Sequence, residues 1–184
     1  MEKFVEIKFF GRGGQGAVTA AEILAKAAIN EGKWAQALPA FGPERRGAPV
    51  LAFTRISDKP IVIRSEVYEP DVIVVLDSTL LKVVDVKAGF KKGGIAIFNS
   101  GKNPPEIQKE LKLREKVATV NATKIALETL GRPIVNTAIL GALVKATQLV
   151  ALKSVIAMTK EVFTGELGIK NITAIEKAYK EVKL

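Results

Sequence analysis

A run of six residues near the start of the chain, Gly11-Arg12-Gly13-Gly14-Gln15-Gly16, has the spacing of a phosphate-binding turn. Glycines at such positions let the backbone turn tightly and approach a ligand closely. An apolar run typical of a strand precedes the motif and an Ala-rich helical run follows it, which is the context the motif requires. N–H groups and the dipole at a helix start favour an anion, and Arg12 adds positive charge. We therefore predict that these six residues contact a phosphate; the alternative is a tight turn that binds nothing.

A dinucleotide would make a further demand on the sequence. In dinucleotide-binding domains an acidic residue ends the second strand and holds the ribose hydroxyls. Here the second strand is expected to end near Ala37-Leu38-Pro39, which contains no carboxylate, and Glu31 precedes that strand. NAD is therefore disfavoured, whereas NADP stays open because Arg45 or Arg46 could meet a 2′-phosphate.

A second unusual segment, 41–49, places two adjacent arginines, Arg45 and Arg46, among Pro and Gly residues. Arginine binds phosphate or carboxylate groups through two parallel hydrogen bonds. The segment follows the second expected strand, so it should lie near the carboxyl ends of the sheet strands, where ligands bind in open α/β sheets. We predict that Arg45 and Arg46 belong to the binding site, where they either hold an anion or pair with carboxylates of a partner chain; the alternative is a solvated loop with a local Glu44 ion pair.

The composition excludes several kinds of chemistry. The chain contains no Cys and no His, which removes disulfides, Cys-ligated iron–sulfur clusters, Cys/His zinc sites and the Ser-His-Asp triad. A redox function would therefore need a cofactor held by polar groups, or partner chains that carry the redox centres. The formal charge of +9 implies attraction to something anionic, although part of it, such as Lys109, Lys112 and Lys116, is interpreted as solvated surface. The abundance of Lys and Glu is also typical of thermophiles.

The apolar patterning predicts the elements that must position these loops. We expect strands at 3–10, 33–38, 49–56, 60–64, 72–76, 94–98 and 116–120, and helices at 17–30, 79–86, 122–130, 137–149, 155–163 and 169–182. The expected fold is α/β: a mainly parallel sheet with helices on both faces, an antiparallel hairpin formed by 49–56 and 60–64, and a helical C-terminal third. No linker divides the chain, so residues 1–184 are expected to form one domain. No segment resembles a signal peptide or is long enough to span a bilayer, which predicts a cytoplasmic protein.

Several segments together are similar to one known family. Residues 10–28, where the glycine motif opens the helix, resemble the start of the gamma subunit of pyruvate and 2-oxoisovalerate ferredoxin oxidoreductases. Residues 41–49 with 52–55 resemble the second signature of that family, and 136–143 and 170–172 are similar to its C-terminal blocks. Blocks that recur in order along the chain are far more specific than any one loop.

This resemblance implies a part in a multi-subunit enzyme. The complete enzyme would oxidise a 2-oxoacid with coenzyme A and oxidised ferredoxin to acyl-CoA, CO2 and reduced ferredoxin. Alpha, beta and delta subunits would carry the thiamine diphosphate and the iron–sulfur clusters. The present chain would help to hold coenzyme A and would reach ferredoxin only indirectly. Alone it is expected to be inactive, without catalytic residues or metal, and able to self-associate.

Two other functions are weighed against this one. The first is a stand-alone NADP-binding reductase, and the second is a basic nucleic-acid-binding domain. Aromatic residues make up only 6% of the chain, and no stacking platform is evident, which disfavours nucleic acid. A membrane partner is not expected.

Overall fold

The computed structural model of the chain describes residues 4–40 and 47–184. Six strands form one mixed sheet in the order β2-β3-β1-β4-β5-β6. The strands are β1 (Phe4–Arg12), β2 (Trp34–Pro39), β3 (Pro49–Ser57), β4 (Val72–Val75), β5 (Ile95–Asn99) and β6 (Lys116–Val120). The helices are α1 (Ala17–Asn30), the 3-10 helix η1 (Ser78–Lys82), α2 (Pro104–Leu111), α3 (Ala122–Leu130), α4 (Asn136–Thr147), α5 (Leu152–Val162) and α6 (Gly165–Glu181).

The sheet has a parallel part and an antiparallel part. β1, β4, β5 and β6 run parallel, whereas β3 pairs antiparallel with β1 on one edge and with β2 on the other. Strand β4 is buried along its whole length, which explains its continuous β-branched sequence. β6 at the far end is bridged by the C-terminal segment through two backbone hydrogen bonds between Thr119 and Lys183, each 2.9 Å long.

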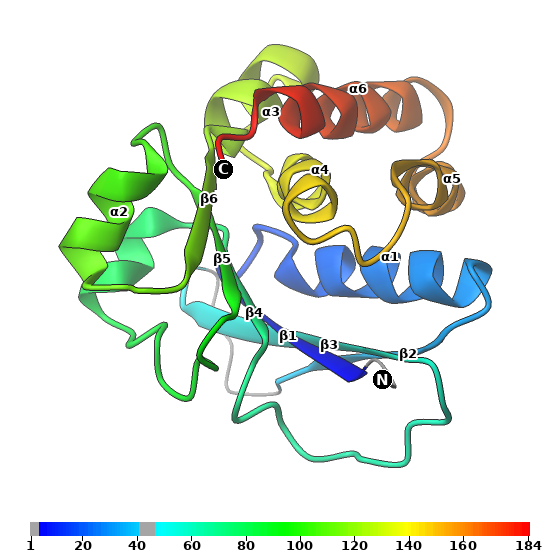
Figure 1. Cartoon of the computed structure of the whole chain (residues 1–184). Coiled ribbons are helices and arrows are strands. Elements are labelled where there is room, and N and C mark those ends of the chain that lie inside the picture. Colours follow the sequence, from blue (N-terminus) through cyan, green and yellow to red (C-terminus); the bar gives the residue numbers. More distant parts are fainter. Residues whose placement is uncertain (1–3, 41–46) are drawn as a thin grey trace.

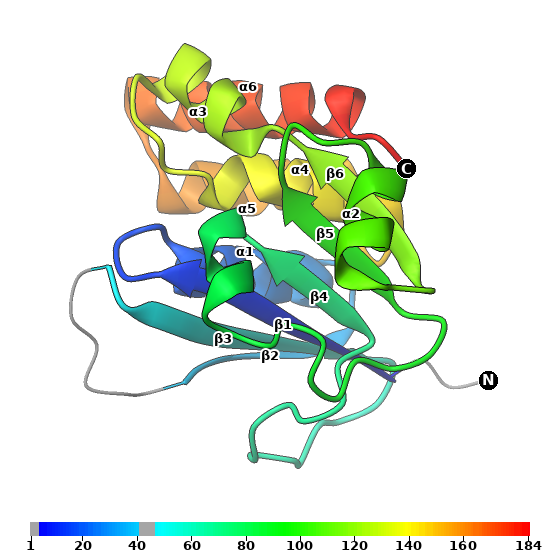
Figure 2. The ribbon, with the colours of Figure 1, turned by 90° about the vertical axis from the view of Figure 1, so that its left-hand side faces the viewer.

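Helices cover both faces of the sheet (Figure 1). α1 and α4 lie directly on one face, and α3, α5 and α6 pack outside them as a further layer. Figure 2 shows η1 and α2 on the opposite face, over the parallel strands. Two clusters of buried apolar side chains, one on each face, form the core. Within the described residues, no helix has both the length and the apolar composition required to cross a bilayer.

The predicted fold class is confirmed, and so is the helical C-terminal third. The antiparallel hairpin, however, is formed by β2 and β3 rather than by 49–56 and 60–64. The predicted strand at 60–64 is wrong, because β3 is already hydrogen-bonded to a neighbour on each edge. Val62, in the middle of that segment, is 85% exposed. The apolar residues of this segment are typical of a strand, but both hydrogen-bonding edges of its expected partner β3 are already occupied.

Two helical segments also differ from expectation. The helix predicted at 79–86 is shorter and is the 3-10 helix η1, although Asp77 does cap it by accepting a hydrogen bond from the Thr79 N–H. A run rich in β-branched Val follows and is unfavourable for a helix. Helix α2 was not expected from the sequence. It begins with a capping box between Asn103 and Glu106, which is a recognisable start signal.

Candidate functional site

The glycine turn, residues 11–16, joins β1 to α1 and packs against the start of α4. Gly16 has a φ of +79° and precedes the first residue of α1. A Cβ built on Gly16 would come within 2.5 Å of the Asn136 Nδ2 atom. Only glycine therefore fits, both because of its backbone conformation and because the buried Asn136 side chain occupies the adjacent space.

Asn136 begins a buried polar chain that fixes the start of α4. Its Oδ1 accepts a hydrogen bond from the Thr137 N–H at 2.9 Å. The Thr137 hydroxyl donates to Oδ1 of Asn171 on α6 at 2.7 Å, and Asn171 Nδ2 donates to the Leu167 carbonyl oxygen at 2.8 Å. Because buried polar groups need such partners, this series of hydrogen bonds connects α6 to α4 and, through Asn136, to the glycine turn.

Arg12 points from the glycine turn to the end of β4. Its Nε lies 3.2 Å from an Asp77 carboxylate oxygen, and its Nη2 donates to the Thr79 hydroxyl at 2.8 Å. Gln15 Nε2 donates to the same Asp77 oxygen at 2.9 Å. The positive charge of Arg12 is therefore largely compensated by Asp77, and the pair holds the turn against the neighbouring strand.

Asp77 accepts the hydrogen bonds of this cluster, and these bonds shift its pKa. Partial burial alone would raise the pKa of Asp77, but the hydrogen bonds from Thr79 and Gln15 and the charge of Arg12 outweigh it and hold the pKa below its ordinary value. A depressed folded-state pKa means that ionised Asp77 stabilises the fold above the unfolded-state pKa. That contribution is lost as pH falls through the lower folded-state pKa.

We expect Asp77→Asn to lower the free energy of unfolding by about 1 to 2 kcal/mol at pH 7, because a charge-assisted acceptor is lost. The difference from the wild type should stay constant above about pH 5 and shrink below about pH 4. Urea unfolding of both proteins across this range measures it. A difference that persisted unchanged to about pH 2.5 would contradict the assigned role of Asp77.

A cleft of about 730 Å³ opens at the carboxyl ends of the parallel strands. This is the edge at which ligands bind in open α/β sheets. Its walls come from the glycine turn, from the segments that follow β4, β5 and β6, and from the connection between α3 and α4. The lining residues are Gly13, Gly14, Gln15, Leu76, Asp77, Ser78, Asn99, Ser100, Gly101, Asn121, Thr123, Arg132, Pro133, Ile134 and Val135.

The cleft is suited to an anion. The N-terminal ends of α1, α3 and α4 all reach its wall, since the glycine turn, the α3 cap Asn121 and the α4 cap Val135 line it. Each helix start carries the partial positive charge of the helix dipole, although side chains of Asn99, Asn121 and Asn136 already accept hydrogen bonds from N–H groups at the starts of α3 and α4. Arg132 adds a full positive charge, while the single carboxylate among the lining residues, Asp77, is paired with Arg12.

Polar side chains hold the floor of the cleft in place. Asn99, at the end of β5, donates through Nδ2 to the Leu76 carbonyl oxygen and to the Thr123 hydroxyl, each at 2.8 Å. The Thr123 N–H donates in return to Asn99 Oδ1 at 3.2 Å. These bonds join the end of β4 to the first turn of α3, so the floor is preorganised.

The predicted site residues are only partly together in the cleft. Gly13, Gly14 and Gln15 line it. Gly11, Arg12 and Gly16 belong to the same turn without lining the cleft. Arg45 and Arg46 lie outside the described residues, so their role stays a prediction.

Arg132 was missed from the sequence. It lies in Gly131-Arg132-Pro133, which was interpreted only as a helix end. The available signal was a cation in the connection between two helices that follow the last parallel strand. Among the described residues, no group of three or more Asp, Glu, His or Cys side chains is placed to hold a metal ion.

Comparison with known protein families gives one match over nearly the whole chain. Residues 6–181 match the family described as pyruvate ferredoxin/flavodoxin oxidoreductase. The chain is 62% identical to the pyruvate/ketoisovalerate oxidoreductases common subunit gamma of Thermococcus kodakarensis over 176 residues, 95% of each chain. It is 54% identical to the pyruvate synthase subunit PorC of Methanothermobacter marburgensis, over 97% of this chain and 98% of that protein.

A solved structure agrees with these relatives. The crystal structure of the pyruvate oxidoreductase subunit PORC from Thermotoga maritima superposes with a TM-score of 0.87 at 38% sequence identity, covering 98% of both chains.

Proposed function

The chain belongs to the pyruvate ferredoxin/flavodoxin oxidoreductase family as a gamma-type subunit, and from this premise we propose that it binds the phosphates of coenzyme A for the complete enzyme. The relatives are named for pyruvate and ketoisovalerate, so a 2-oxoacid of that kind is the proposed substrate of the complex. The reaction would convert the 2-oxoacid, coenzyme A and oxidised ferredoxin to acyl-CoA, CO2 and reduced ferredoxin.

The electrostatics of the cleft support this proposal. Coenzyme A carries a pyrophosphate and a 3′-phosphate, so its site must satisfy charge at two places. Three helix starts and Arg132 surround one cleft, and among the described residues the single carboxylate that lines it is already paired. This convergence is the observation that carries the proposal, because helix N-termini and arginine are the common means of binding phosphate. Arg45 and Arg46 are proposed as further phosphate contacts.

The rest of the chemistry is proposed to lie on partner chains. This chain has no Cys and no His, so it offers no thiolate for an iron–sulfur cluster. Thiamine diphosphate and the clusters are proposed to sit on alpha, beta and delta subunits. Residues 1–184 would then act as one binding domain of a cytoplasmic complex, since coenzyme A and ferredoxin are intracellular molecules.

Arg132→Ala in the assembled enzyme is expected to raise the KM for coenzyme A about tenfold, because one charge-assisted phosphate contact contributes about 1.5 to 3 kcal/mol. The KM for the 2-oxoacid should stay within about twofold, since that substrate reacts on a partner chain. Steady-state kinetics with each substrate varied in turn measures both constants.

Arg114→Ala provides the matched control, because Arg114 is exposed and does not line the cleft. Calorimetry with coenzyme A, 3′-dephospho-CoA and NADP tests the ligand class. Tighter binding of NADP than of coenzyme A would favour the alternative reductase function. An unchanged KM for coenzyme A in Arg132→Ala would remove Arg132 from the site.

A further inference from the structure

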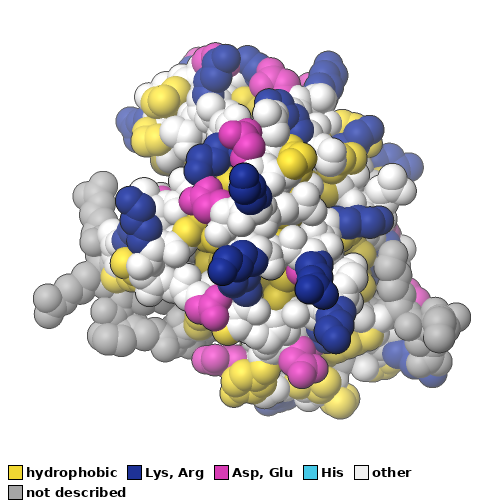
Figure 3. Space-filling model, turned by 60° about the vertical axis from the view of Figure 1, so that its left-hand side comes forward, with side chains coloured by type: hydrophobic (Ala, Val, Ile, Leu, Met, Phe, Trp, Pro, Cys, Tyr) yellow, Lys and Arg dark blue, Asp and Glu magenta, His cyan; other side chains and the backbone are white. Residues whose placement is uncertain are grey.

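The positive charge of the chain is concentrated in one part of it. Residues 82–116 contain nine Lys or Arg and four Asp or Glu, a net charge of +5 out of the +9 of the whole chain. In the fold this segment runs from the end of η1 through β5 and α2 to the start of β6. Figure 3 brings this side forward and shows Lys and Arg side chains spread over it, with hydrophobic side chains between them.

A shallow depression lies within this surface, between η1 and the C-terminal end of α2. We call it the basic hollow; its volume is about 500 Å³ and its lining residues are Leu81, Lys82, Val83, Val84, Asp85, Val86, Lys87, Glu110, Leu111 and Lys112. Val83 is 65% exposed, so the hollow has an accessible apolar patch among its lysines. An apolar centre with a charged rim is the usual anatomy of a protein interface.

Two of the three lysines that line the basic hollow are available to a partner. Within residues 4–40 and 47–184, Lys82 and Lys112 form no ion pair, and both are exposed. The Lys87 ammonium group donates a hydrogen bond to the Leu111 carbonyl oxygen at 3.0 Å and so compensates the partial negative charge at the end of α2. The hollow is also lined by two carboxylates: Glu110 is paired with Lys102 at 2.5 Å, and Asp85 accepts a hydrogen bond from the Lys87 backbone N–H at 3.0 Å.

This balance of charge and apolar area favours a reversible partner. Permanent subunit interfaces are large and mainly apolar, whereas transient encounters rely on charged rims that steer association. A cationic rim with a small apolar centre fits an acidic protein that binds and leaves. Resting on the proposed function, we propose that the basic hollow docks the acidic carrier protein that accepts the electrons, ferredoxin. This contact would be direct, in place of the indirect one that the family resemblance implied.

Lys82→Glu/Lys112→Glu in the assembled enzyme tests this docking surface. We expect the KM for ferredoxin to rise roughly five- to tenfold, because the double variant reverses two rim charges that steer the encounter. Activity with methyl viologen, a small cationic acceptor, should stay within about twofold of the wild type. The wild-type KM for ferredoxin should also rise between about 0.02 M and 0.2 M salt, and the variant should respond less.

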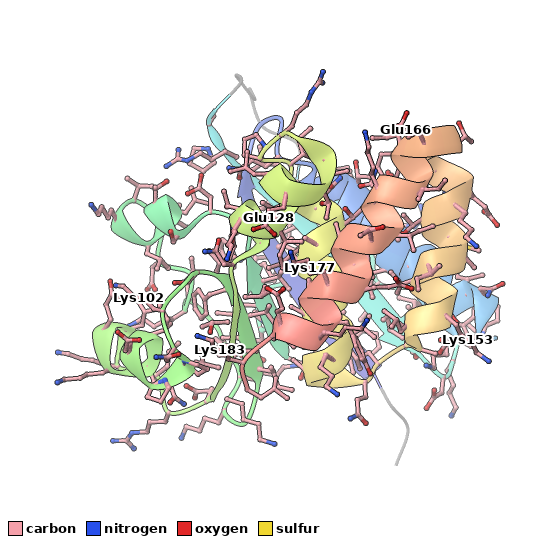
Figure 4. The ribbon with its side chains drawn as sticks, turned by 90° about the horizontal axis from the view of Figure 1, so that it is seen from above. Lys102, Glu128, Lys153, Glu166, Lys177 and Lys183 are labelled. Atoms are coloured by element: carbon pink, nitrogen blue, oxygen red, sulfur yellow. The ribbon has the colours of Figure 1, made fainter. Side chains whose placement is uncertain are left out.

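Lys153→Glu/Lys160→Glu is the matched control, with the same change in net charge. Both lysines are exposed on α5, and neither forms an ion pair within the described part of the chain. Figure 4 shows Lys153 on the opposite side of the molecule from Lys102 beside α2. The milder Lys82→Gln/Lys112→Gln variant is used if charge reversal prevents assembly of the complex. Because it removes the two charges without reversing them, the logarithm of its KM for ferredoxin should rise by about half as much.

The two assays separate this inference from the proposed function. Loss of 2-oxoacid- and coenzyme A-dependent reduction of viologen by the wild-type complex would count against the proposed function. With that activity intact, equal ferredoxin KM values in the wild type and in both hollow variants would overturn the docking surface. Weaker DNA binding by the hollow variants with an unchanged ferredoxin KM would also overturn it and would identify a general polyanion surface.

Discussion

Gly16→Ala is expected to lower the free energy of unfolding by about 3 kcal/mol. The positive φ of Gly16 costs a residue with a side chain about 1 kcal/mol or more, and the new methyl group would overlap the buried Asn136 amide. Asn136 cannot simply turn away, because its Oδ1 is hydrogen-bonded to the Thr137 N–H. Urea or guanidinium unfolding of the purified chain measures the loss, and coenzyme A binding should weaken with it.

Gly32→Ala is the control that separates backbone strain from the contact with Asn136. Gly32 has the same φ of +79°, but a Cβ there would meet nothing within 4 Å. We expect this control to lose only about 1 kcal/mol and to bind coenzyme A normally. Equal losses in the two variants would mean that the glycine turn does not depend on the start of α4.

Gly141→Ala is expected to destabilise the chain by about 3 kcal/mol or more, through a different contact. Gly141 lies within α4 where this helix packs on α6, and a Cβ at this position would overlap the carbonyl oxygen of Ile175. Because the obstacle is backbone rather than a flexible side chain, the two helices must move apart. Thermal and chemical unfolding should both report the loss.

The sign of this effect is informative in itself. In an unobstructed helix, replacing Gly by Ala stabilises by about 1 kcal/mol, because alanine has the higher helix propensity. A neutral or stabilising Gly141→Ala would therefore contradict the close packing of α4 on α6. Gly141→Val should be worse than Gly141→Ala, since the larger side chain requires a wider separation.

The sequence was sufficient for elements whose pattern is local. The strand at 116–120 and the helix at 122–130 were predicted with the bounds that β6 and α3 have. β6 is a short, mainly apolar run that follows charged residues, and Asn121 and Gly131 supply a cap at each end of α3. Local signals of this kind do not depend on how the sheet is assembled.

The errors arise where assembly decides the outcome. The segment 60–64 has the apolar residues of a strand, but both edges of β3 are taken by strands that come earlier in the chain. Likewise, the positions of the glycine turn and of Asp77 followed from their places after strands, but the ion pair of Arg12 with Asp77 did not. These two residues are 65 positions apart, and their pairing depends on the parallel register of β1 and β4. Arg132 was missed for the same reason.

The cleft is built from residues as far apart in the chain as Gly13 and Val135, and this has a consequence for folding. No short fragment can contain the cleft, because its walls meet only after the parallel strands have found one another. A ligand held there will therefore bind to the fully folded chain and hardly at all to partly folded forms, and it will raise the melting temperature in proportion to the logarithm of its concentration once it is above the dissociation constant. The melting temperature of the purified subunit thus reports the concentration of the ligand around it.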